Sequence, residues 1–414
     1  MNATRREHLL ALNRQVVDLA RTLKVLSALS WPEDAESRFL QSVAAGNPVP
    51  PNVVLAPPPG LIDDAVFSAV AQKLDAGDPV QAWLGRTLES ARAGMDLLGR
   101  LGKPGFAEAS ARLYGKPTDP CHPGAPSALA VALHFLRSTD RLRVGEPRAT
   151  LDDEAALAWL REQVVIAFPD DPPRVELDEG LPSLASASSM RIRLRRGARF
   201  SRVQLRQLLQ HEALVHTATR RNGKTQPVLS AMGLSLPRTT STQEGLATLA
   251  ELVTDTMDLA RLRRIALRVV ALHDALEGAS FVEVWHKFRS SGQGDTESYQ
   301  SAARIFRGGD GAPDRGVFAK DGVYVGGLMR VQGFMLTAIR DGEKDFPLKL
   351  FAGRLTSGDV VDLREAFEDG TIEGPRIAPE WVRDLDCLAA ALTVAGLSTQ
   401  IDLDAVELES FTER

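Results

Sequence analysis

Strand-forming patterns occupy only a short part of this chain, between two long stretches whose apolar residues recur at helical spacing. The clearest strand is MRIRLRR, where Met190, Ile192 and Leu194 point to one side and the arginines to the other. A second strand is predicted in the preceding segment, FPDDPPRVELDEG. Helices, then a few strands, then helices predict an α+β fold with a small sheet in the middle.

Composition excludes several classes of protein. Of the 414 residues, 44% are hydrophobic and 25% are charged, as in an ordinary soluble globular protein. The formal net charge of −5 gives no support for nucleic acid as a partner. We find neither a signal peptide nor an apolar run long enough for a membrane span. Two cysteines and no CxxC argue against a disulfide framework or a thiolate zinc site. We therefore expect a cytoplasmic protein without a membrane partner.

The segment HEALVH, from His211 to His216, lies in a predicted helix that begins at Ser201, where Gln204 completes a capping box. Two histidines around a glutamate are typical of zinc hydrolases, but there the histidines are four residues apart and here they are five. Five residues turn a regular helix by about 140°, too far for both rings to reach one metal ion. We predict a π-bulge or local unwinding between them. The alternative is two ordinary polar residues on a helix.

A third metal ligand is predicted in TTSTQEGLA. A catalytic zinc site needs three protein ligands and an open position for water, and Glu244 lies near the start of the next predicted helix, with Ser241 or Thr242 as N-cap. Gly245 lets another backbone approach closely. The alternative is a glutamate that only complements the dipole of its helix.

These motifs together resemble a known family. HExxxH is followed by NG, QP and QEGLA, and this combination resembles the QEGLA-motif proteins of bacteria. Those are similar to the microtubule-associated tyrosine carboxypeptidases of animals, zinc metallopeptidases that remove the C-terminal tyrosine from tubulin. The stretches RIFRGG and VFAKDGVYVGGL also match, and ARLYGKP matches more weakly. The resemblance covers residues 110–345.

The resemblance implies a zincin-like metallopeptidase core with a small sheet and an active-site helix, flanked by N- and C-terminal helices. It implies that His211, His216 and Glu244 bind Zn2+ and that Glu212 is the general base for a zinc-activated water. We expect three regions that pack as one unit. They are an N-terminal helical region (1–145), the catalytic core (146–345) and a C-terminal helical region (346–414).

The predicted function is therefore a zinc-dependent carboxypeptidase that removes a C-terminal residue, with tyrosine as a candidate, from a peptide or protein. Five residues are predicted to bind substrate or stabilise the oxyanion: Arg304, Arg307, Lys320, Tyr324 and Tyr299. The strand MRIRLRR is expected to border the substrate cleft as an edge strand. The competing interpretation is a non-catalytic, zinc-stabilised binding or regulatory protein that affects gene expression, although such a protein has no need of Glu212 as a base.

Overall fold

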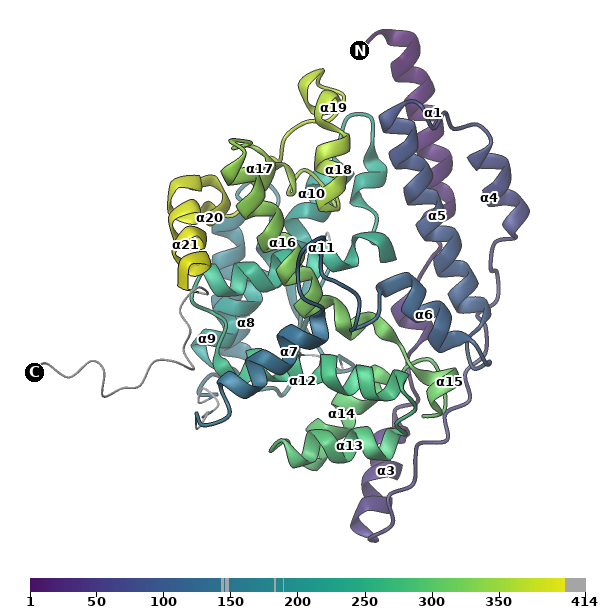
Figure 1. The fold of residues 1–414 in the computed structure, drawn as a ribbon, viewed down its shortest axis with the longest axis vertical. Helices are drawn as coiled ribbons and strands as arrows, with labels where there is room; N and C mark the ends of the chain where they lie inside the picture. Colours follow the sequence, from purple (N-terminus) through teal and green to yellow (C-terminus); the bar gives the residue numbers. More distant parts are fainter. Residues whose placement is uncertain (143–144, 146–148, 182–183, 189, 399–414) are drawn as a thin grey trace, which may run out of the picture.

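A computed structural model describes residues 1–142, 145, 149–181, 184–188 and 190–398. The described chain is mostly helical with a small three-stranded sheet, so the α+β prediction is confirmed (Figure 1). No helix in this part of the chain combines the length and apolarity that crossing a membrane requires. The end of the predicted C-terminal region, beyond residue 398, lies outside the described residues.

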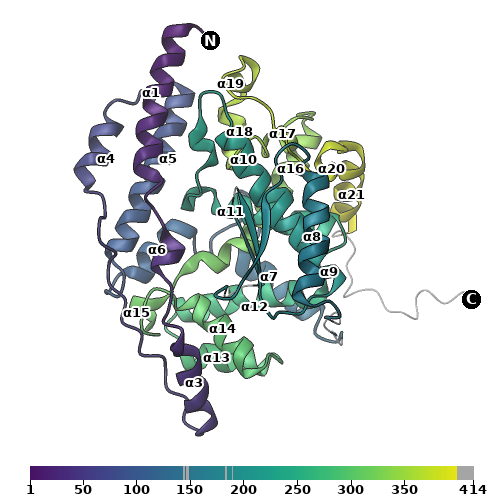
Figure 2. The same cartoon turned by 180° about the vertical axis from the view of Figure 1, so that it is seen from behind.

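The N-terminal region consists of helices joined by loops. Its two longest helices, α1 and α5, lie side by side along one edge of the molecule (Figures 1 and 2). The helices before the sheet are Ala3–Ala20 (α1), Val25–Ala28 (α2), Asp34–Ala44 (α3), Asp64–Ala71 (α4), Pro79–Gly99 (α5), Phe106–Tyr114 (α6), Ala128–Ser138 (α7) and Asp153–Ala167 (α8).

The sheet has the order β1–β3–β2, from Arg174–Asp178 (β1), Ala185–Ala187 (β2) and Arg191–Arg195 (β3). Strand β3 pairs in parallel with β1 and antiparallel with β2. The helix α8 packs beside this sheet (Figure 2). Both strands predicted from the sequence are thus present, and Ile192 and Leu194 are fully buried as expected.

Two details of the strand prediction are wrong. Met190 precedes the strand and is 56% exposed, so it does not join the apolar face. The strand β3 is the middle strand and not an edge, because strands pair with it on both sides. It therefore has no free backbone groups to offer an extended peptide. Its arginines pair with acids of β1: Arg191 lies 3.2 Å from Glu176, and Arg193 lies 2.8 Å from Asp178.

After the sheet, one interrupted helix carries HEALVH. It runs as Arg202–Leu208 (α9), a π-helix Leu209–Thr217 (η1) and Ala218–Lys224 (α10). The capping box of Ser201 and Gln204 is present as predicted. Two elements follow, the 3-10 helix Ser230–Gly233 (η2) and the helix Pro237–Val253 (α11). The predicted N-cap is wrong, because Pro237 opens α11 as its first residue and leaves Ser241 and Thr242 inside it.

The remaining elements of the described chain are helical. The helix α16 lies directly against α11 near the centre of the molecule (Figure 1). In chain order they are Leu259–Leu276 (α12), Phe281–Ser290 (α13), Asp295–Ile305 (α14), Pro313–Gly316 (α15), Ala319–Gly322 (η3), Val323–Arg340 (α16), Phe346–Lys349 (α17), Ser357–Asp362 (α18), Arg364–Glu368 (α19), Glu380–Arg383 (α20) and Leu385–Ser398 (α21).

Candidate metal centre

Three potential metal ligands meet where the π-helix η1 faces α11. The ligand atoms of His211, His216 and Glu244 all lie within 4.8 Å of one another. Glu244 Oε2 is 3.6 Å from Nε2 of His211 and 3.7 Å from Nε2 of His216. Two ligands of one tetrahedral zinc ion are separated by about 3.3 Å, given bonds of about 2.0–2.1 Å. These spacings are therefore suited to a single small cation between the three side chains.

The spacing of the histidines is accommodated by π-helical geometry, as predicted. Both residues lie within η1, whose hydrogen bonds close over five residues instead of four. Residues five apart are then about one turn apart and share a face. The two imidazole rings stand edge to face, with centroids 4.8 Å apart. The extra residue in HExxxH is thus absorbed by the helix itself, without unwinding.

The orientation of His211 is set by a buried carboxylate. Its Nδ1 lies 2.7 Å from Oε1 of Glu251, which has no exposed surface. Glu251 also accepts hydrogen bonds from Gln207 at 2.8 Å and from Arg261 at 3.2 and 3.3 Å. With its Nδ1 proton donated to Glu251, a neutral His211 would have the lone pair of Nε2 free to bind a metal ion beside Glu244. The sequence interpretation missed Glu251, although it lies two helical turns after Glu244 on α11.

The two carboxylate oxygens of Glu244 have different surroundings. Its Oε1 accepts a hydrogen bond of 2.7 Å from Nζ of Lys320, whereas its buried Oε2 has no hydrogen-bond partner among the described residues. Nδ1 of His216 is also buried without such a partner. An unsatisfied buried acceptor is costly, and a cation beside Oε2 would satisfy it. The residues present therefore fit a metal ion.

Cations keep both buried glutamates ionised. Burial on its own would raise the pKa of Glu251, but Arg261 and His211 outweigh it and lower that pKa to about 2. Burial also acts to raise the pKa of Glu244, and Lys320 together with the two histidines brings it well below its ordinary value. A metal ligand has to be deprotonated, so this is the state in which Glu244 can bind a cation.

Two glycines bring Glu244 close to Lys320. A Cβ on Gly245 would collide with the carbonyl of Gly327, and a Cβ on Gly327 would collide with the carbonyl of Ser241. The backbones of α11 and α16 are therefore in direct contact at this crossing. The close approach predicted for Gly245 is confirmed, and it places Glu244 next to the start of α16, which Lys320 immediately precedes.

The predicted substrate-binding residues fall into two groups. Lys320 and Tyr324 lie together beside Glu244, with Nζ of Lys320 5.3 Å from the centre of the tyrosine ring. Tyr299 instead packs against the rings of Trp31, Phe39 and Phe281 in an aromatic cluster. The structure thus brings Lys320 and Tyr324 to the candidate centre and holds Tyr299 in the hydrophobic core.

The two arginines of RIFRGG differ in their partners. Arg304 forms a two-pronged ion pair with Asp321, at 2.7 and 2.9 Å. Arg307 lies beyond the end of α14, so the two do not share a helical face. Half-buried Arg307 has no ion pair with a described residue, and burial together with nearby Arg304 lowers its pKa to about 10. Of the two, Arg307 is the one whose guanidinium has no carboxylate partner.

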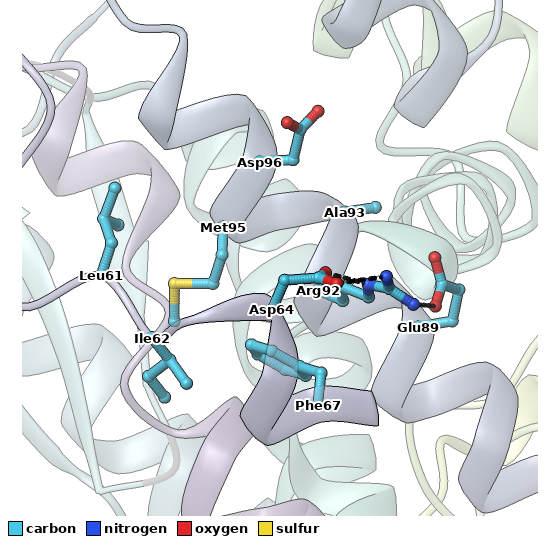
Figure 3. A pocket seen from close by; sticks show the side chains of 9 residues that line it. All are labelled: Leu61, Ile62, Asp64, Phe67, Glu89, Arg92, Ala93, Met95 and Asp96. Atoms are coloured by element: carbon cyan, nitrogen blue, oxygen red, sulfur yellow. Dashed lines mark hydrogen bonds and ion pairs between the residues drawn. The ribbon is translucent and has the colours of Figure 1, made fainter. Parts of the chain in front are cut away.

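A surface hollow elsewhere on the molecule is not part of this centre. It measures about 540 Å³ and lies between α4 and α5, with an ion pair of Asp64 and Arg92 at its wall (Figure 3). None of the candidate site residues lines it. The hollow is therefore separate from the His211, His216 and Glu244 cluster.

This chain is similar to proteins of a known family. The model of the family "Microtubule-associated tyrosine carboxypeptidase" matches residues 38–399. Microtubule-associated tyrosine carboxypeptidase 1 from Rattus norvegicus is 29% identical to this chain over 182 residues, and the protein of the same name from Mus musculus is 28% identical over 182 residues. Each match covers 43% of this chain but only 36% of the relative, so the chain matches about a third of their length.

Among solved structures, the chain is similar to the crystal structure of a protein from Colwellia psychrerythraea, with a TM-score of 0.38 and 12% sequence identity. The alignment covers 80% of this chain and 66% of the other chain. A likeness that weak carries no argument about the fold. The family match is of a different kind, because it extends from α3 into the last described helix and includes every residue of the candidate centre. The chain therefore belongs to the microtubule-associated tyrosine carboxypeptidase family.

Proposed function

We propose that this protein is a zinc-dependent carboxypeptidase with a zincin-like core. The observation that carries the proposal is the arrangement of His211, His216 and Glu244, in which the buried Oε2 of Glu244 faces both histidines and has no hydrogen-bond partner among the described residues. Two histidines and a glutamate are a ligand set of catalytic zinc sites, which leave a fourth position open. The names of the family and of the rat and mouse relatives support a carboxypeptidase activity.

Glu212 is the proposed general base. It follows His211 directly within η1, and its carboxylate has no hydrogen bond or ion pair to a described residue. A bound zinc ion would act as a Lewis acid and lower the pKa of a water molecule to about 7. Glu212 accepts the proton as the water oxygen bonds to the peptide carbonyl carbon. It then delivers that proton to the amide nitrogen as the C–N bond breaks and the carbonyl re-forms.

Unpaired arginines supply a candidate site for the terminal carboxylate of a substrate. Arg307 and Arg268, which lies on α12, form no ion pair with a described residue. Burial and nearby Arg304 lower the pKa of Arg268 to about 9, which leaves it charged at neutral pH. The planar fork of arginine suits a carboxylate. Lys320 and Tyr324 would lie between these arginines and the proposed metal ion. Arg304, which is ion-paired with Asp321, would position Tyr324.

The proposal is tested by mass spectrometry of peptides incubated with the zinc-loaded protein. We expect loss of single C-terminal residues from peptides with a free carboxylate, with tyrosine among the residues removed. Blocking the C-terminus as an amide should suppress cleavage. The Glu212→Gln variant should keep its zinc but lose activity by a factor on the order of 100–10,000, because it lacks the base.

Three outcomes separate this proposal from its alternatives. Cleavage in the peptide interior, or equal cleavage of amidated peptides, would identify an endopeptidase. Zinc bound without any turnover would favour a non-catalytic, zinc-stabilised binding or regulatory protein. Protein purified without chelators that contains no zinc, and takes none up, would refute the metal centre.

A further inference from the structure

A further arginine without an ion pair to a described residue, Arg354, contacts the backbone of His216 at the candidate centre. It belongs to the loop between α17 and α18, far along the chain from the HEALVH helix. Its Nη2 donates a hydrogen bond of 3.4 Å to the carbonyl of His216, and its buried Nε has no partner among the described residues. The guanidinium therefore reaches the backbone of a proposed metal ligand while most of its donors are unused.

Several cations of this neighbourhood are paired with carboxylates, whereas Arg220, Arg268 and Arg307 form no ion pair with a described residue. Lys320 is bound to Glu244, Arg261 to Glu251 and Arg304 to Asp321. Arg354 forms no ion pair with any described residue. Arginine stays protonated at neutral pH, so this side chain is a cation. Arg354 is half-buried with a buried Nε, and partial burial of a cation without a carboxylate partner is costly.

The loop that carries Arg354 is fixed in place by side chains of the HEALVH helix and of the turn that follows it. Nδ2 of Asn222 donates to the carbonyl of Phe351 at 2.7 Å, and Nε2 of Gln226 donates to the carbonyl of Ala352 at 3.0 Å. The amide of Arg354 donates to the carbonyl of Met232 at 2.7 Å. These bonds anchor the loop to the same helix that carries the histidines.

A close backbone contact also holds this loop in place. A Cβ on Gly223 would collide with Met232, and Gly353 packs against Met232 from the loop side. Gly223 lies inside α10, which continues to Lys224, and its backbone is not left-handed. Its role here is close packing, which helps hold Arg354 at the candidate centre.

We propose that Arg354 is a catalytic residue that donates a hydrogen bond to the oxyanion formed on the substrate carbonyl. This rests on the proposed peptidase function and adds a residue to it. When the water oxygen bonds to the carbonyl carbon, the C=O π electrons move to the carbonyl oxygen, and Glu212 takes the proton. A preorganised charged donor that lacks a carboxylate partner stabilises that oxygen more than it stabilises the neutral carbonyl.

The test compares the zinc-loaded protein with its Arg354→Gln variant on a peptide ending in tyrosine. We expect kcat to fall by roughly 100- to 1000-fold, with KM changed by less than about threefold. Affinity for a phosphonate analogue of that peptide, measured by calorimetry, should fall by a comparable factor because the phosphonate resembles the oxyanion. The second ligand is a peptide with a D-residue at its C-terminus, which keeps the ordinary amide bond and is not cleaved. Its affinity should be nearly the same for the wild type and for Arg354→Gln.

Arg220 provides the matched control. It is a half-buried arginine four residues after His216, and its buried Nε has no hydrogen-bond partner among the described residues. Arg220→Gln should change kcat and phosphonate affinity by less than about tenfold. Zinc content and the melting temperature are measured for every variant. Should Arg354→Gln unfold or lose zinc, Arg354→Lys decides, since it keeps the charge and should retain most phosphonate affinity.

The outcomes distinguish this inference from the proposed function. A wild-type protein that cleaves normally beside an Arg354→Gln variant with normal kcat would overturn only the role of Arg354. A loss confined to KM, or equal losses for the phosphonate and the amide analogue, would also overturn it. A wild-type protein that binds zinc without cleaving any peptide would overturn both.

Discussion

The contacts of Glu251 lead to a specific prediction about metal affinity. It accepts from Nδ1 of His211 and is itself neutralised by Arg261. Glu251→Gln keeps the shape but removes the charge that fixes and polarises the imidazole. We expect zinc affinity to fall by about 10- to 100-fold, as for other carboxylates behind a histidine ligand. Competition with a chromophoric chelator measures it, and exposed Glu277→Gln is the control. Unchanged affinity would contradict the role given to Glu251.

At this scale, residues close in sequence were predictable and residues joined by folding were not. His211, Glu212 and His216 fall in one hexapeptide, and Glu244 follows in a recognisable motif. Glu251 and Arg354 carry no local pattern, because their positions at the centre come from helix packing and from a loop more than a hundred residues away. Lys320 was predicted near substrate, but which carboxylate it would bind depends on how α11 and α16 cross.

Among elements, periodicity predicted what each segment would be but not which neighbours it would meet. The alternation in β3 identified a strand, yet nothing in it distinguishes a middle strand from an edge strand. The π-helix was predictable, because five-residue spacing and a shared metal ion are incompatible on a regular helix. The first residues of helices were harder to predict. Ser241 and Thr242 fit an N-cap by residue type, but α11 begins earlier, at Pro237.

Because α11 and α16 cross in direct backbone contact, we can predict how adding one methyl group at the crossing affects stability and zinc binding. Gly245→Ala would place a Cβ against the backbone of Gly327, which cannot move as a side-chain tip can. We expect a loss of about 1–3 kcal/mol in the free energy of unfolding, as for other overpacked contacts, and weaker zinc binding because Glu244 moves with its helix. Denaturant unfolding and chelator competition measure the two effects.

Gly326→Ala is the matched control for that experiment. It lies on the same helix, α16, but an added Cβ there would meet only the Cβ of Ala128 at 3.6 Å, an ordinary contact. Its stability and zinc affinity should stay near those of the wild type. Equal behaviour of the two variants would mean that the close crossing does not position Glu244.

At the scale of the whole molecule, one hydrophobic cluster includes Leu9, Leu246 and Leu392, one from each of the three predicted regions. A buried charge links the same regions. Asp359 at the start of α18 accepts from Arg238 of α11 at 2.6 and 2.8 Å and from Arg86 of α5 at 3.3 Å. This carboxylate is 1% exposed. Its ion pairs therefore hold the C-terminal helices against the rest of the protein.

Removing that carboxylate charge should destabilise the molecule as a unit. We expect Asp359→Asn to lower the free energy of unfolding by about 3–5 kcal/mol, because it leaves mostly buried Arg238 without its partner. Asp362→Asn is the control: it also removes a partner of Arg86, at 2.9 Å, but that carboxylate is 52% exposed, so the loss should stay below about 1 kcal/mol. Urea unfolding at neutral pH measures both, and equal losses would contradict the assignment.

The pH dependence gives an independent check on Asp359. Burial acts to raise its pKa, but the hydrogen bonds from Arg238 and from the Thr356 backbone outweigh it and hold that pKa below the ordinary value. A carboxyl group whose pKa is lowered by folding stabilises the protein fully above its unfolded pKa of about 3.9, and this contribution is lost as the pH falls through the folded value. The stability difference between wild type and Asp359→Asn should therefore be constant from about pH 6 down to pH 5 and should shrink below about pH 4. A difference that persists unchanged at pH 2.5 would mean that packing, and not the charge of Asp359, joins these helices.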